Sequence, residues 1–358
     1  MFRKIVCTKL STDFRGATEI VTVPRASLKV TPGTVLIKNV VVGINASDIN
    51  YTNGKYNPGV QPPFDCGFEG GAFDYHEALA NSYASTVYGA FSEYVVVPIK
   101  LAAKVPVATA EILPLNVCGL TASIALDTVG EVISAHTQQF PFEIKCYLES
   151  DLLPQMKTGE TVLVTAAAGA TGQFAVQLAK LAGNTVIGTC SSPEKQEYLK
   201  SIGCDRAIDY TKEDVGTVLA KEFPRGVDLV FESVGGSIFE TCMNNLAKHG
   251  RLVVIGSISG YADSSSWSGG STSSPFASTL LSKSASVRGF FLNHFIKTHV
   301  TTHARKLATL VRHGLLNSGV DPAKFSGLDS VADAIEYLYA RKNIGKLVVH
   351  LDTPHSSL

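Results

Sequence analysis

One stretch of the chain, Thr161–Lys180, constrains the fold more than any other. It opens with an apolar, β-branched run over residues 161–165, which predicts a buried parallel strand. Small residues follow over 166–172, and the chain continues as a helix whose apolar face includes Phe174 and Leu178. A strand, a tight turn and a helix in this order predict a dinucleotide-binding unit, because free N–H groups at the helix N-terminus attract a pyrophosphate.

The turn carries a partial form of the glycine fingerprint of such units. Gly169 is expected to let the backbone approach the phosphates, and Gly172 to let the helix pack closely against the strand. Ala167 stands where the first glycine of the full G-x-G-x-x-G pattern would be. The turn by itself therefore leaves an ordinary strand-to-helix connection as an alternative.

The end of the next strand, Thr185–Thr189, indicates which dinucleotide would bind. NAD-binding units carry an Asp or Glu there that holds the ribose 2′-hydroxyl, and this chain has no acid at that place. Ser191 and Ser192 instead supply hydroxyls and Lys195 supplies a positive charge, a combination that suits the 2′-phosphate of NADP. The alternative is that the serines only cap the following helix and that Lys195 is solvated.

Composition limits the classes of protein and partner. The length of 358 residues indicates about two domains, and the formal net charge of +0 provides no field for nucleic acid or an anionic membrane. The 7 cysteines are well separated and include no C-x-x-C pair, which argues against a disulfide framework or zinc cluster and favours a reducing compartment. We expect no membrane span, because no apolar run approaches roughly 18 residues. We expect no secretory signal either.

The last residues of the chain give an indication of localisation. Ser356-Ser357-Leu358 shares its first and last residues with the S-K-L peroxisomal address but lacks the basic middle one. We expect a peroxisomal protein, with the cytoplasm as the alternative.

The remaining pattern divides the chain. Residues 1–118 indicate a unit rich in strands, and the strands that alternate with helices from 161 to 292 predict an α/β fold with a doubly wound parallel sheet. Residues 128–158 have no clear period and are expected to form a loop or insertion. A Ser/Gly-rich stretch that contains the single tryptophan, Trp267, is expected to be a surface loop.

Seven motifs, in order along the chain, resemble the medium-chain dehydrogenase/reductase superfamily, in its zinc-free quinone oxidoreductase and prostaglandin reductase branch. The motifs are Gly43-Ile-Asn-Ala-Ser-Asp-Ile-Asn, Gly54-Lys-Tyr, Gly67-Phe-Glu-Gly, Ala166-Ala-Ala-Gly-Ala-Thr-Gly-Gln, Gly188-Thr-Cys-Ser-Ser, Glu232-Ser-Val-Gly-Gly and Gly345-Lys-Leu-Val-Val. The resemblance implies a GroES-like β-barrel domain that begins over 1–118, a Rossmann domain over 119–295, and a return to the barrel domain over 296–358.

The same resemblance implies an enzyme that uses NADPH to reduce the carbon–carbon double bond of α,β-unsaturated ketones, with 15-keto-prostaglandins as the named substrate class. It implies a small-molecule enone or quinone substrate and a homodimer. An NADPH quinone oxidoreductase, a non-catalytic NADPH-binding relative and a zinc alcohol dehydrogenase remain as alternatives.

Zinc is not expected in this chain. The zinc alcohol dehydrogenases place a Cys after the second strand and a His in a Gly-His-Glu motif, and here those positions are Asn45 and Phe68. A structural zinc site would need four closely spaced cysteines, which the sequence lacks. Without a Lewis acid, hydrogen-bond donors must stabilise the enolate charge, and a proton must reach the α-carbon from water or a side chain.

The resemblance also implies the site residues. Tyr261 matches a tyrosine beside the nicotinamide ribose and the substrate, and Asn45 and Tyr56 match polar positions of the cleft, so these three are the predicted catalytic residues. The alternative for Tyr261 is a loop anchor with a buried ring. The cofactor-binding residues implied by the motifs are Gly169, Thr171, Gly172, Ser191, Lys195, Tyr210, Ser233, Ile255, Tyr261, Phe290, Phe291, Leu292 and Asn343.

The chain departs from the family pattern in two places. The segment Gly71–Asn81 is shorter than in the family and lacks its strand pattern, and a barrel that lacks a strand there would have an unpaired sheet edge. Residues 128–158 replace a connection of only a few residues. Both departures are either specific to this lineage or errors of exon assignment.

Overall fold

The computed structural model describes residues 1–74, 82–86, 89–105, 109–129, 158–261 and 273–351. Three predicted features lie outside these residues, namely most of the insertion over 128–158, the loop around Trp267, and the terminal Ser356-Ser357-Leu358. Among the helices of the described residues, none is long and apolar enough to cross a membrane.

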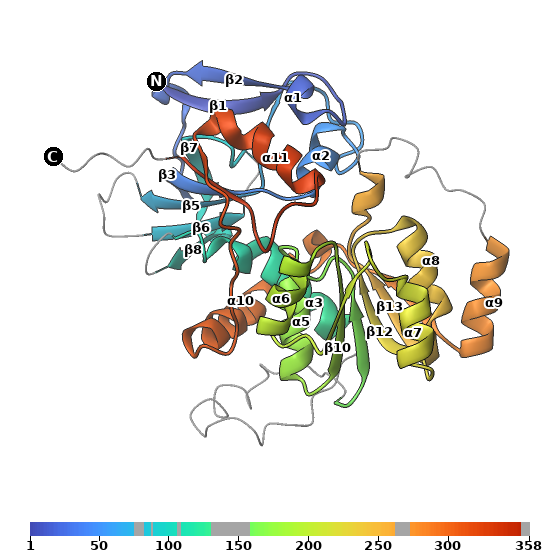
Figure 1. Ribbon diagram of the computed structural model, residues 1–358. Helices are drawn as coiled ribbons and strands as arrows, with labels where there is room; N and C mark the ends of the chain where they lie inside the picture. The colour runs from blue at the N-terminus through green and yellow to red at the C-terminus, as the bar shows by residue number, and fades with distance from the viewer. Residues whose placement is uncertain (75–81, 87–88, 106–108, 130–157, 262–272, 352–358) are drawn as a thin grey trace. The chain divides into compact units, whose positions relative to one another are not determined.

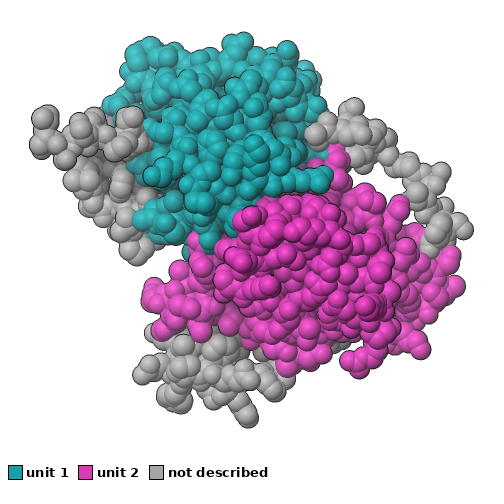
Figure 2. Space-filling view, in the orientation of Figure 1, with its two compact units in different colours: residues 1–117, 261–264, 319–358 teal, residues 118–260, 265–318 magenta. Residues whose placement is uncertain are grey.

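The chain forms two compact units, which Figure 2 draws in different colours. Unit 1 consists of Met1–Val117, Tyr261–Ser264 and Gly319–Leu358, and unit 2 consists of Cys118–Gly260 and Ser265–Ser318. The chain returns to unit 1 at residue 319, whereas the resemblance implied a return at 296. The reason is that helix α10 (Ile296–Arg312) packs against helix α3 (Leu120–Thr128) of unit 2.

Unit 2 is built on a six-stranded parallel sheet in the order β11-β10-β9-β12-β13-β14 (Figure 1). Its strands are β9 (Thr161–Val164), β10 (Thr185–Cys190), β11 (Arg206–Asp209), β12 (Val227–Glu232), β13 (Leu246–Val254) and β14 (Ser286–Gly289). The strand order reverses between β9 and β12, as in a doubly wound sheet, and this confirms the predicted Rossmann fold.

Helices cover both faces of this sheet (Figure 1). Those that follow the strands are α5 (Gly172–Leu181), α6 (Pro193–Ser201), α7 (Val215–Glu222), α8 (Gly236–Asn244) and α9 (Ser273–Lys283). Leu163, Ile187, Val230 and Leu252 come from four different strands and lie in one buried apolar cluster. Burial on both faces explains why the strands are near-continuous apolar runs.

Unit 1 contains two sheets of mainly antiparallel strands. The smaller has the order β2-β1-β4, and the larger has the order β15-β16-β3-β5-β6-β8, with β7 paired to β3. The strands are β1 (Phe2–Cys7), β2 (Thr18–Val23), β3 (Thr34–Gly43), β4 (Phe64–Asp65), β5 (Glu69–Asp74), β6 (Ser82–Thr86), β7 (Tyr94–Pro98), β8 (Ala102–Val105), β15 (Phe325–Ser326) and β16 (Val348–His350). The helices are α1 (Phe14–Ala17), α2 (Ser47–Thr52) and α11 (Val331–Tyr339).

No barrel strand is missing directly after Gly70 in the part of the chain that the structure describes. Strand β5 pairs with β3 on one side and with β6 on the other, and β6 pairs in turn with β8. The shortened segment therefore still supplies both strands, and the edge that the loss of a strand would leave unpaired is occupied. The sequence pattern missed β6 because Ser82–Thr86 is polar and short.

The C-terminal segment completes the larger sheet of unit 1. Strand β16 pairs antiparallel with β3, with Val348 opposite Gly43, and β15 pairs parallel with β16. Helix α11 places Val331 and Ile335 in the same apolar core as Ile44 and Phe91 from the N-terminal part. The first and last parts of the chain thus fold as one body.

A buried polar cluster joins α3 and α10 within unit 2. Lys306 Nζ donates to Asp127 Oδ2 (3.1 Å), and Ser123 Oγ is hydrogen-bonded to His303 Nδ1 (2.8 Å). Burial, with the nearby charges of Lys306 and His299, lowers the pKa of His303 from 6.5 to about 3. His303 is therefore neutral in the folded protein at all but the most acidic pH.

This shift predicts a pH-dependent stability. The unfolded chain takes up a proton on His303 below pH 6.5 whereas the folded chain does not, so stability is present above that pH and falls as the pH drops towards 3. Acidification from about pH 7.5 to about pH 5.5 should remove about 1.4 kcal/mol of the free energy of unfolding through this group. Chemical denaturation should show that His303→Gln loses this increment, and that the exposed His313→Gln keeps it. An equal pH dependence in the wild type and His303→Gln would contradict the assignment.

Candidate active site

The turn between β9 and α5 is held closely against β10. Ala166 has a left-handed backbone with φ of 46°, and its N–H donates to Thr189 Oγ1 (3.2 Å). Ala167 N–H donates to the backbone oxygen of Thr189 (3.0 Å). A Cβ on Gly172 would lie 2.5 Å from Ala166 O, so glycine is required for α5 to begin directly against the turn.

The N-terminal end of α5 is open to a ligand. Thr171 precedes the helix and makes no side-chain capping bond with a described residue. A Cβ on Gly169 would meet only Ala166 O, at 3.1 Å, among the described atoms within 4 Å. The N–H groups of Gln173, Phe174 and Ala175 are bonded to Gly169 O and Thr171 O, so α5 offers a negatively charged group mainly the positive end of its dipole.

Ser191, Lys195 and Tyr210 come together at the carboxyl end of β10. Lys195 Nζ donates to Ser191 Oγ (3.2 Å), and Tyr210 N–H donates to Cys190 O (3.0 Å). Ser192 caps α6 by accepting from Lys195 N–H (3.3 Å), so the capping alternative holds for Ser192. Lys195 itself is only 8% exposed, and the alternative of a solvated lysine is wrong.

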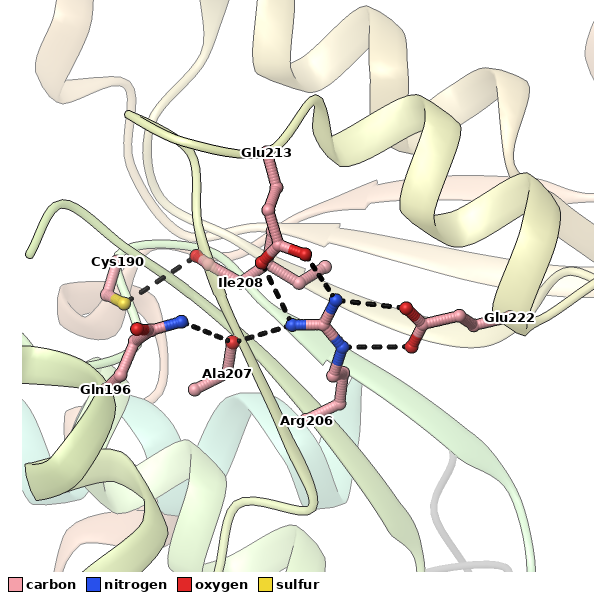
Figure 3. Close-up of polar contacts among 7 residues, drawn as sticks. All are labelled: Cys190, Gln196, Arg206, Ala207, Ile208, Glu213 and Glu222. Atoms are coloured by element: carbon pink, nitrogen blue, oxygen red, sulfur yellow. Dashed lines mark hydrogen bonds and ion pairs between the residues drawn. The ribbon is translucent and has the colours of Figure 1, made fainter. Parts of the chain in front are cut away.

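Another cation of this region, Arg206, is already neutralised. Figure 3 shows its guanidinium between the carboxylates of Glu213 (2.7 Å) and Glu222 (2.9 Å). It also donates to Ala207 O (3.0 Å), which accepts from Gln196 Nε2 (3.0 Å) as well and so joins α6 to β11. Arg206 therefore has a structural role in joining α6, β11 and the residues that follow β11.

The carboxyl ends of β12, β13 and β14 bring the other predicted residues of unit 2 side by side. Ile255 N–H donates to the backbone oxygen of Glu232 (2.8 Å), and Phe290 N–H donates to that of Val254 (2.8 Å). Ser233 follows Glu232, and Phe291 and Leu292 follow Phe290. All of these residues lie at the carboxyl ends of the strands, on the same side of the sheet as the N-terminus of α5. Ligands of open α/β sheets usually bind there.

A group of three tyrosines, Tyr56, Tyr261 and Tyr339, forms a cluster in unit 1. Burial raises the pKa of Tyr56, and the adjacent hydroxyl of Tyr261, to which Tyr56 is hydrogen-bonded, raises it further. Tyr339 donates from its hydroxyl to Ala46 O (2.8 Å), and its pKa is raised by burial and by its neighbours Asp48, Tyr261 and Tyr56. The tyrosine cluster therefore unites two of the three predicted catalytic residues.

Aromatic rings adjoin the tyrosine cluster. The ring centroids of Tyr56 and Phe68 are 6.3 Å apart at an interplanar angle of 88°, and those of Tyr51 and Phe68 are 5.2 Å apart. Tyr51 also contacts Phe64 edge-to-face at 4.9 Å. These contacts present apolar ring surface beside phenolic hydroxyls, an arrangement suited to an apolar molecule with one polar group.

The third predicted catalytic residue, Asn45, is bound into a buried ion pair. Glu69 and Lys346 pair with each other, and both side chains are 0% exposed. Asn45 Oδ1 accepts from Lys346 Nζ (2.7 Å), and Asn45 Nδ2 donates to Glu69 Oε1 (3.1 Å). A Cβ on Gly43 would lie 2.5 Å from Glu69 Oε1, so glycine makes room for this carboxylate. The amide of Asn45 thus positions the ion pair.

The chemistry of these side chains does not suit zinc. An amide at Asn45, a ring at Phe68 and an ammonium at Lys346 are not zinc donors, and a buried ammonium repels a divalent cation. Over the described part of the chain, no three His, Cys, Asp or Glu side chains are grouped so that they could hold a metal ion.

Four residues of this region were not predicted from the sequence: Asp48, Glu69, Lys346 and Tyr339. Three of them lie inside quoted motifs, but a motif does not tell a buried charge from a solvated one. Asp48 Oδ2 accepts from Asn45 N–H (2.8 Å). Burial also raises the pKa of Asp48 to about 8. Tyr339 lies on an ordinary amphipathic helix and gave no signal.

Asn343, the last predicted cofactor residue, belongs to unit 1, where its Nδ2 donates to Gly345 O (3.0 Å). A groove of about 600 Å³ in the same unit lies along β3, β16 and residues 320–324. None of its lining residues belongs to the tyrosine cluster or to the Glu69–Lys346 ion pair.

Known proteins are similar to this chain over almost its whole length. A family model described as zinc-binding dehydrogenase matches residues 170–309. The mouse protein named Prostaglandin reductase-3 is 44% identical over 99% of this chain and 91% of its own length. A probable quinone oxidoreductase of Leishmania amazonensis is 40% identical over 98% of both chains.

A solved structure agrees with this placement. The quinone oxidoreductase of Thermus thermophilus, solved alone and in complex with NADPH, has a TM-score of 0.71 and 26% identity, covering 98% of this chain and 100% of that one. The chain therefore belongs to the medium-chain dehydrogenase/reductase superfamily, in the branch of the prostaglandin reductases and quinone oxidoreductases.

Proposed function

We propose that this protein uses NADPH to reduce the carbon–carbon double bond of α,β-unsaturated ketones, with 15-keto-prostaglandins as the substrate class. The observation that carries this proposal is the 44% identity with mouse Prostaglandin reductase-3 over 99% of the chain. The aromatic rings and phenolic hydroxyls of unit 1 support it, because an enone of this class combines long apolar chains with a carbonyl oxygen that needs a hydrogen-bond donor.

The residues of unit 2 fit NADPH. The open N-terminus of α5, with Gly169, Thr171 and Gly172, would hold the pyrophosphate. Lys195, Ser191 and Tyr210 would hold the 2′-phosphate, and Ser233, Ile255 and Phe290–Leu292 would line the rest of the molecule. When bound, NADPH supplies the hydride for the β-carbon of the enone. Contacts from Tyr261 and Asn343 of unit 1 remain predictions.

The side chains of unit 1 would supply the polar chemistry. Reduction of an enone leaves negative charge on the carbonyl oxygen, and a donor aimed at that oxygen lowers the barrier. The paired hydroxyls of Tyr56 and Tyr261 are suited to donate a hydrogen bond there and to deliver a proton to the α-carbon. We assign Asn45 the different role of holding Lys346 and Glu69 in place, since both polar ends of its amide are used for that.

The role of Lys195 predicts a change in cofactor preference. Lys195→Ala removes a charge-assisted contact worth about 1.5–3 kcal/mol, so the KM for NADPH should rise roughly ten- to a hundredfold, whereas the KM for NADH should stay unchanged. Steady-state kinetics with both cofactors measure this difference. Lys200→Ala, an exposed lysine of the same helix, is the matched control. Equal losses with the two cofactors would show that Lys195 does not read the 2′-phosphate.

The tyrosine pair predicts a loss of turnover. Tyr56→Phe and Tyr261→Phe keep the rings but remove the hydroxyls, and each should lower kcat by about 10²-fold. Because the two hydroxyls act together, the double variant should lose less than the product of the single losses. Tyr337→Phe, on α11 but packed on Phe325, should retain wild-type kcat. If both single variants turn over an enone at the wild-type rate, the tyrosines are not the donors.

A quinone is the second candidate substrate, favoured by the Leishmania amazonensis relative. Parallel assays of NADPH oxidation with a simple quinone and with an enone separate the two activities. NADPH binding without turnover of either would indicate a non-catalytic relative.

We also propose a homodimer. Strand β14 is the last strand on one side of the parallel sheet of unit 2 over the described residues, and such an edge can pair with a second copy. Light scattering should give twice the chain mass of 38.0 kDa.

A further inference from the structure

Asp48 is a buried carboxyl group with one oxygen that lacks a partner. The side chain is 2% exposed, and its Oδ2 accepts from Asn45 N–H at 2.8 Å. Its Oδ1 has no hydrogen-bond partner among the described residues. An ionised carboxylate in this position would leave a bare negative charge on Oδ1, so the geometry favours a protonated carboxyl whose O–H lies on Oδ1.

The charged and titratable groups around Asp48 come from several elements. Lys346 acts on it with a positive charge and Glu69 with a negative one, and these two are paired with each other. The hydroxyls of Tyr56 and Tyr339 lie close enough for Asp48 to raise their pKa values, and so does the Cys66 thiol. The Asp48 carboxyl group therefore lies near Tyr56 and Tyr339 of the tyrosine cluster.

Asn50 lies two residues after Asp48 on α2, and its backbone oxygen accepts from Tyr56 N–H at 3.2 Å. Its side chain is 0% exposed, and neither its Oδ1 nor its Nδ2 has a hydrogen-bond partner among the described residues. Buried polar groups of this kind are normally satisfied, and a bound water is the usual partner when protein atoms do not suffice. Asp48 and Asn50 thus place unsatisfied buried polar atoms on α2, next to the segment that carries Tyr56.

We propose that Asp48 is the proton reservoir for the Tyr56–Tyr261 pair, and this proposal rests on the proposed function. After a tyrosine hydroxyl has given its proton to the α-carbon, the Asp48 Oδ1–H bond breaks and the tyrosine O–H bond forms again. The Asp48 carboxylate then takes a proton from solvent water. No electrons move in these steps, since the reduction of the double bond is complete once the hydride and the proton have been added.

The reservoir has a consequence for the pH dependence of turnover. The pKa of Asp48 is raised to about 8 by burial, so the group holds its proton at neutral pH and loses it as the pH rises through that value. An ionised Asp48 can no longer supply a proton. Turnover should therefore fall on the alkaline side, well below the pH at which a tyrosine would ionise.

The first test uses Asp48→Asn, which keeps the acceptor for Asn45 N–H but has no proton to give. With saturating NADPH and enone, kcat should fall roughly tenfold or more, and the alkaline limb near pH 8 should disappear from the kcat profile. Asp13→Asn is the control, because Asp13 also caps a backbone N–H, that of Gly16, but is exposed. A wild-type kcat and pH profile in Asp48→Asn would overturn the proposal.

The second test needs neither substrate nor cofactor and is independent of the proposed activity. Infrared spectra of the wild-type protein at neutral pH should contain the carbonyl stretch of a neutral carboxylic acid, which should vanish as the pH rises through about 8 and be absent from Asp48→Asn. Because burial also raises the pKa of Asp127 and of Glu232, the band is read from the difference between the wild-type and Asp48→Asn spectra, and the absence of this difference band would overturn the reservoir. If the infrared result holds but the wild type reduces no enone, it is the proposed function that fails.

Discussion

The buried ion pair between Glu69 and Lys346 is the interaction on which unit 1 depends. It joins the beginning of β5 to the segment before β16, and Asn45 extends it to the start of α2. Two charges with 0% exposure are tolerated only when each is paired and hydrogen-bonded, and loss of one partner from such a pair typically costs about 3–5 kcal/mol. The C-terminal segment is thereby fixed to the N-terminal sheet at the place where Asp48 and the tyrosine cluster gather.

In unit 2, the positions of the predicted cofactor-binding residues depend instead on the parallel arrangement of the strands. Because the strands are parallel, the carboxyl ends of β9, β10, β12, β13 and β14 all lie at the same end of the sheet. Residues far apart in the sequence therefore come together there without specific contacts between them. The close turn at Gly172 then brings the N-terminus of α5 to the same end. At the end of β10, the ammonium group of the buried Lys195 donates to Ser191, whereas Arg206 is paired with Glu213 and Glu222.

The features that follow from local pattern could be predicted from the sequence. The strand–turn–helix pattern at Thr161–Lys180 predicted the Rossmann sheet. Ser191, Ser192 and Lys195, which follow β10, predicted NADPH as the cofactor. Strand β6 could not be predicted, because a short polar strand is recognised only through its neighbours β5 and β8. The positions of Asp48 and Lys346 could not be predicted either. Whether an acidic or basic side chain is buried depends on segments that meet only in the folded chain.

The most direct test of the account is product analysis after incubation of the purified protein with NADPH and a 15-keto-prostaglandin. The account predicts a product in which the carbon–carbon double bond is saturated and the ketone is intact, formed with NADPH far faster than with NADH. A product with a reduced carbonyl group, or NADPH binding without any product, would contradict it.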